Sequence, residues 1–70
     1  MTIVINGEPH ESQAANVLEL WKEFTTGLEI EGPQGFAIAL NGALVRKTQW
    51  QSTHVTQGDR IEIVRPMQGG

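Results

Sequence analysis

The sequence contains no cysteine, and this absence excludes several kinds of site at once. Without thiols the chain has no disulfides, no thiolate metal sites, no iron–sulfur clusters and no cysteine nucleophile. Basic residues are also few, because five lysines and arginines stand against eight acidic residues and give a net charge of -3. Such a chain repels a phosphate backbone and has no basic stripe, so nucleic acid is not an expected partner.

Long apolar runs are missing as well. No segment approaches the roughly 20 apolar residues that span a bilayer, and the N-terminus lacks the regions of a signal peptide. We therefore expect no membrane association and a cytoplasmic location.

Groups that would perform catalysis are sparse. His10 and His54 stand alone as candidates, and no glycine loop has the pattern of a phosphate site. The carboxylate pair at helical spacing, Glu19 and Glu23, falls on the solvent side of a predicted helix. We therefore predict that the chain is not an enzyme and has no catalytic residue, no metal site and no bound cofactor.

The first half of the sequence predicts a hairpin and then a helix. Residues 2–6 are apolar and β-branched, the Asn-Gly pair at 6–7 is a strong hairpin signal, and the polar return strand at 9–13 contains a proline, as edge strands do. Asn16 and Glu19 have the spacing of a capping box, so the helix should begin after Asn16 and end before Gly27. The predicted core stripe of the helix, at spacings of three and four, is Val17, Leu20, Trp21, Phe24 and Leu28.

The second half predicts three more strands. A loop rich in glycine and proline, residues 29–35, separates them from the helix. A second Asn-Gly pair, at 41–42, predicts another hairpin. Trp50 falls in a stretch without a clean period, and we predict that it packs over an open edge of the core with its indole N–H near water. The predicted strands are residues 36–40, 43–45 and 60–65.

One helix and five strands bury the helix stripe most simply when the helix lies across one face of a mixed sheet. The predicted fold is therefore α+β, a β-grasp with a mixed five-stranded sheet and one helix packed across one face. The apolar first and last strands should pair in parallel at the centre. We expect residues 1–65 to form this domain and residues 66–70 to form a flexible diglycine tail.

Strand alternation also predicts what the opposite face of the sheet carries. If the isoleucines of the first and last strands point at the helix, Val4 and Val64 point away from it. The small side chains of Ala37 and Ala39 should lie beside them. Such a flat, partly apolar face is a candidate docking surface, although scattered surface aliphatics are also ordinary.

The end of the sequence is chemically unusual. Gly69 and Gly70 lack Cβ atoms and can pass through a slot too narrow for side chains, while Pro66 cannot donate to a sheet ladder and should release the tail. If Gly70 is the natural end, its carboxylate is anionic at neutral pH and needs activation before acyl transfer. Adenylation by an ATP-using partner supplies this, and a sulfur nucleophile then gives a thiocarboxylate. A frayed, inert terminus is the alternative.

These features resemble the ThiS-type sulfur carriers of thiamine biosynthesis, which are small ubiquitin-like β-grasp proteins. Residues 41–50, Asn-Gly-Ala-Leu-Val-Arg-Lys-Thr-Gln-Trp, are similar to the family's Asn, Val, basic residue and Trp. Residues 57–63 are similar to its Gly-Asp turn and last strand, and residues 67–70 match its diglycine tail. The family often has a proline before the basic residue, where this chain has Arg46 and Lys47.

The resemblance implies a cycle in which partner proteins act on the tail. An E1-like adenylating enzyme would activate the Gly70 carboxylate with ATP and Mg²⁺, and sulfur from a cysteine desulfurase pathway would replace AMP. The chain would then donate sulfur to thiazole synthase, as a co-substrate that is monomeric when free. Arg65 would seat the tail against an acidic partner or the ATP phosphates, or would simply be solvated. The residues recognised along the tail would be Arg65, Pro66, Met67, Gln68 and Gly69.

Two other functions stay open at this point. The small subunit of molybdopterin synthase uses the same tail chemistry for a different cofactor, although those chains are usually somewhat longer. A ubiquitin-like protein modifier, or a binding module with an inert tail, belongs to a different class. Covalent adducts on other proteins would indicate a modifier, and exchange of sulfur for oxygen at the terminus would indicate a carrier.

Overall fold

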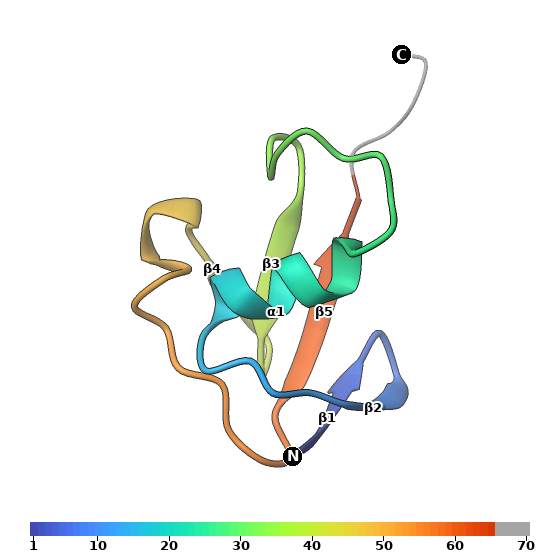
Figure 1. Cartoon of the computed structure of the whole chain (residues 1–70). Helices are drawn as coiled ribbons and strands as arrows, with labels where there is room; N and C mark the ends of the chain where they lie inside the picture. Colours follow the sequence, from blue (N-terminus) through green and yellow to red (C-terminus); the bar gives the residue numbers. More distant parts are fainter. Residues whose placement is uncertain (66–70) are drawn as a thin grey trace.

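A computed structural model describes residues 1–65 and contains five strands and one α-helix in the predicted order (Figure 1). The sheet has the strand order β2-β1-β5-β3-β4, with β1 and β5 parallel and the other neighbours antiparallel. The helix lies across one face of this sheet (Figure 1), so the predicted β-grasp fold is confirmed. The elements are β1 (Thr2–Ile5), β2 (Glu8–Glu11), α1 (Val17–Thr25), β3 (Ala37–Leu40), β4 (Ala43–Val45), a 3₁₀ helix η1 (Lys47–Gln49) and β5 (Arg60–Val64).

The strands alternate as their sequences predict. Ile3 and Ile5 of β1 and Ile61 and Ile63 of β5 are buried under the helix, because a strand points alternate side chains to opposite faces. The edge strand β2 is exposed throughout and begins and ends earlier than the predicted residues 9–13. The predicted strand at 36–40 is β3, with the buried Phe36 directly before it.

Helix α1 begins as predicted but is shorter than its apolar stripe. Asn16 caps it, because its Oδ1 accepts the Glu19 N–H at 2.9 Å, while the Glu19 carboxylate accepts the Ala15 N–H at 2.8 Å, one residue earlier than a capping box requires. Gly27 lies just past the end with φ +85°, the conformation that terminates helices. The helix has therefore ended before Leu28, so the prediction that Leu28 completes the stripe is wrong, and this residue is 44% exposed.

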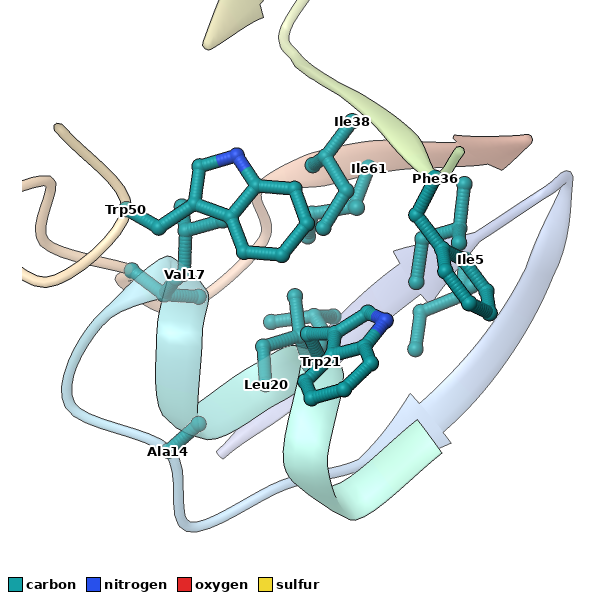
Figure 2. Packing of buried hydrophobic residues seen from close by; sticks show 12 residues of the cluster. Ile5, Ala14, Val17, Leu20, Trp21, Phe36, Ile38, Trp50 and Ile61 are labelled. Carbon is teal, nitrogen blue, oxygen red and sulfur yellow. The ribbon is translucent and has the colours of Figure 1, made fainter. Parts of the chain in front are cut away.

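Three aromatic side chains form the centre of the core between helix and sheet (Figure 2). The rings of Trp21 and Phe36 meet edge to face, with centroids 5.5 Å apart, and the rings of Trp21 and Trp50 lie 6.0 Å apart. Trp50 is 1% exposed, and its Nε1 donates to the Val45 carbonyl at 2.9 Å. Packing by Trp50 is thus confirmed, but the predicted position of its indole N–H near water is wrong, because a backbone carbonyl of β4 takes the place of water.

The stretch between β4 and β5 completes the start of the helix. The first N–H groups of a helix have no partners within it. Here the Val17 N–H donates to the Thr53 carbonyl at 2.9 Å, and the Leu18 N–H donates to the Trp50 carbonyl at 3.1 Å. The segment is therefore irregular, because its backbone carbonyls pair with the start of the helix rather than with a neighbouring strand.

Candidate functional site

The site indicated by the sequence begins where β5 ends. Ile61 and Ile63 anchor this strand in the core, while Glu62 and Val64 face outward. Arg65, the last described residue, is exposed directly after it. The predictions for residues 66–70, including the sulfur-carrying Gly70, lie outside the described residues and stay predictions.

The neighbours of β5 reach unequal distances along it. On one side β3 follows β5 to its end, because Ala37 pairs with Val64 and Ile38 pairs with Ile63. On the other side β1 pairs Val4 with Arg60 and Ile5 with Ile61, and then turns away (Figure 1). The last residues of β5 therefore extend past the backbone of β1.

At this edge of β5, the side chain of Asn6 pairs with the strand in place of the β1 backbone. The Asn6 carboxamide donates from Nδ2 to the Ile63 carbonyl at 3.2 Å and accepts the Ile63 N–H at Oδ1 at 2.9 Å. Both backbone groups of Ile63 are thereby paired on the side that β1 has left. From the sequence, Asn6 was identified only as part of a turn signal. Its carboxamide, which can both donate and accept hydrogen bonds, was not recognised there as a possible partner for a strand backbone.

Asn41 holds the start of β5 in a similar way. Its Oδ1 accepts the Arg60 N–H at 2.8 Å, and its Nδ2 donates to the Asp59 carboxylate at 3.0 Å. The Thr56 N–H also donates to that carboxylate, at 2.8 Å. The Asn41 side chain first, and then the Thr56 backbone, lower the pKa of Asp59 below its ordinary value, because their donors favour the charged form.

The face of the sheet opposite the helix carries apolar side chains, but in a different arrangement from the predicted one. Val64 is 60% exposed and lies opposite Ala37, as predicted. Val4 pairs with Pro9 and Arg60, so β5 separates it from the alanines. Leu44 is 72% exposed opposite Ala39, and the sequence did not single it out. We call the set of Val4, Ala37, Ala39, Leu44 and Val64 the outer face.

Charge is divided unequally along the chain. Residues 8–31, which include β2 and α1, contain six glutamates and one lysine, while residues 32–65 contain four basic and two acidic residues. The outer face is crossed by Arg60 and Glu62 of β5, which project on the same side as Val64. The outer face therefore combines apolar side chains with one basic and one acidic side chain, Arg60 and Glu62. Most carboxylates of the chain lie in its N-terminal half.

Within residues 1–65, no three histidine, aspartate or glutamate side chains lie close enough together to hold a metal ion. The same part of the chain has no helix with the length and apolar character needed to cross a bilayer.

Comparison with known proteins gives a consistent result. The model of the ThiS family matches residues 3–70. A crystal structure of the thiamine biosynthesis protein ThiS from Geobacter metallireducens is 27% identical, with a TM-score of 0.76 and full coverage of both chains. A solution structure of a thiamine biosynthesis protein from the same organism is 29% identical, with a TM-score of 0.73, and the match covers all of this chain and 88% of that one. Among curated proteins, none matches the chain.

Proposed function

The chain belongs to the ThiS family of small sulfur carriers, and we propose that it carries sulfur as a thiocarboxylate on Gly70 for thiazole formation in thiamine biosynthesis. The observation that supports this most is the extent of the family match, which continues through residue 70 and so includes the diglycine end. Because the chain has no cysteine, the terminal carboxyl group is the natural place for the sulfur.

The proposed chemistry has two steps on the terminal carbonyl. A carboxylate oxygen of Gly70 attacks the α-phosphorus of ATP, with Mg²⁺ on the phosphates, and pyrophosphate leaves. A cysteine desulfurase pathway supplies the sulfur as a persulfide, and a thiol reductant releases it as sulfide and is itself oxidised to a disulfide. The sulfide then attacks the acyl adenylate and displaces AMP. Both steps take place in an E1-like adenylating enzyme, so the chain is a protein co-substrate rather than a catalyst.

We assign the contacts with partners to the end of β5 and the outer face. Because Gly69 and Gly70 have no side chains, they suit a narrow channel that leads to the adenylation site. Within the outer face, Val64 lies on the strand that runs into the tail, so a partner that binds the tail also meets this side chain. Arg65 is exposed at the start of the tail, where it is available for an acidic group or a phosphate of the partner.

Deletion of Gly70 tests this proposal. We expect the shortened chain to fold like the wild type but to lose sulfur transfer, because the attacked carbonyl is displaced by one residue. Growth of a thiamine-requiring strain that lacks its own carrier is the measurement, and circular dichroism checks the fold. A second variant with one residue added after Gly70 should also fail. A Gly70-deleted chain that restores growth without thiamine would exclude the proposal.

A further inference from the structure

We infer that Asn6 is a positioning residue for the C-terminal tail: its carboxamide extends the sheet past the end of β1 and fixes the direction in which β5 delivers the tail. This inference rests on the proposed function, because it concerns how Gly70 is presented. The Asn6 side chain lies far from Gly70 in sequence, and it acts through the backbone of Ile63.

The geometry gives the carboxamide the role of a missing peptide group. The Asn6 backbone N–H donates to the Ile61 carbonyl at 2.9 Å, and this is where the β1 backbone turns away from β5. The next residue of β5 that faces the same edge is Ile63, two positions on. A carboxamide carries one carbonyl oxygen and N–H donors, as a peptide group does, and the Asn6 side chain pairs with both backbone groups of Ile63.

The turn itself places the Asn6 side chain there. Asn6 has φ +51° and Gly7 has φ +84°, which fits the two-residue hairpin turn with two left-handed positions. Asparagine tolerates this conformation better than other residues with a side chain. One residue therefore reverses the chain with its backbone and continues the sheet with its side chain.

The pairing decides how far along β5 the backbone is held before the tail begins. With Asn6 in place, Ile63 is held on one side by the carboxamide and on the other by the pairing of β5 with β3. A fully extended chain from Ile63 to Gly70, seven residues on, would span about 25 Å, so a small change of direction at Ile63 would displace its end by several ångströms. Without the carboxamide, Ile61 is the last residue held by β1.

Asn41 supplies a matched control within the same protein. It also has φ +51°, also precedes a glycine, and also bonds the backbone of β5, but at Arg60, the end away from the tail. Asn6→Gly and Asn41→Gly each keep a residue that accepts the left-handed conformation and each remove one carboxamide. The two variants thus differ mainly in which end of β5 is released.

The experiment compares both variants with the wild type in two measurements. Amide hydrogen exchange should become about tenfold faster at Ile63 in Asn6→Gly, and at Arg60 in Asn41→Gly, because each loses the acceptor of that N–H. Pyrophosphate release by an E1-like adenylating enzyme with ATP and Mg²⁺ should show a KM for the carrier about fivefold higher in Asn6→Gly, with kcat unchanged, because a less ordered tail costs more to seat. Asn41→Gly should keep the wild-type KM.

Several results would overturn the positioning role of Asn6. If the two variants have the same KM, or if Ile63 exchanges faster in Asn6→Gly without a rise in KM, the positioning role of Asn6 is overturned. If the wild-type chain itself releases no pyrophosphate, the proposed function fails and this inference fails with it. Should Asn6→Gly not fold, Asn6→Asp replaces it, because it keeps an acceptor for the Ile63 N–H and loses the donor to the Ile63 carbonyl. An unchanged KM in Asn6→Asp would then overturn the inference.

Discussion

The indole N–H groups of the two core tryptophans differ in their hydrogen bonding. Trp50 Nε1 donates to the Val45 carbonyl, whereas Trp21 Nε1 is buried without an acceptor among the described residues. Figure 2 shows the Trp21 nitrogen on the side of the ring that faces Phe36, whose plane is at 80° to the indole. An N–H directed at an aromatic face is a weak interaction, so the polar group of Trp21 contributes less than that of Trp50.

Replacement of each tryptophan by phenylalanine should reveal this difference. Both changes remove part of a buried ring, but only Trp50→Phe removes a hydrogen bond to a backbone carbonyl. We expect Trp50→Phe to lower the free energy of unfolding by about 1 kcal/mol more than Trp21→Phe does. Urea denaturation of both variants measures this, and equal losses would show that the bond to Val45 contributes nothing.

Asp59 should make stability depend on pH in the acid range. Its pKa is lower in the folded state than in the unfolded state, where it is about 3.9. Its contribution is therefore fully present above about pH 4 and is lost as pH falls through the folded-state pKa. Urea denaturation between about pH 5 and pH 2 should show a smaller acid-induced loss for Asp59→Asn than for the wild type. Parallel curves would contradict this.

At the scale of elements, the strands and the helix start were predictable because each depends on a local pattern. The alternation of Ile61 and Ile63, the two Asn-Gly pairs and the cap at Asn16 each specify a structure within a few residues. The course of the segment between β4 and β5 was not predictable, because it is set by hydrogen bonds from the first backbone N–H groups of α1 to carbonyls of this segment. Leu28 was assigned wrongly, because its spacing continues the helical stripe after the helix has ended.

The β3–β4 hairpin offers a test of how strongly its turn conformation matters. Gly42 has φ +89° and Gly32 does not have a left-handed φ, while a Cβ at either position would meet no atom within 4 Å. Gly42→Ala should therefore cost about 1 kcal/mol of stability through backbone conformation alone. Gly32→Ala is the control and should be neutral or slightly stabilising. Thermal unfolding compares them, and an equal effect of the two changes would refute the assignment.

At the scale of the whole molecule, the fold and the site were predictable to different depths. The β-grasp arrangement followed from the need to cover one helix stripe with one sheet, and the structure confirms it. The composition of the outer face was only partly predictable, because which side chains adjoin depends on strand order. That order puts Val4 across β5 from the alanines and brings Leu44 beside Ala39. The hydrogen bonds of Asn6 with Ile63 could not be predicted from the sequence, because the two residues are distant in the chain and only the folded structure shows that they meet.

The outer face should matter for partner binding and little for folding. Val64→Lys places a charge in its apolar part at a position that is 60% exposed, so stability should change by no more than about 0.5 kcal/mol. We expect binding to the adenylating enzyme to weaken about tenfold, since a charge at the core of an interface is desolvated. Leu28→Lys, at an exposed position outside this face, is the control. Equal binding by both variants, measured by calorimetry, would argue against docking through the outer face.

The most direct test of the central claim is the intact mass of the protein purified from its native cell under thiamine starvation. We expect a chain that ends at Gly70, with a fraction heavier by the replacement of one oxygen by one sulfur, and fragmentation should place this change on the terminal residue. A chain that continues past residue 70 without trimming, or one that never gains AMP or sulfur at its end, would contradict the proposed role.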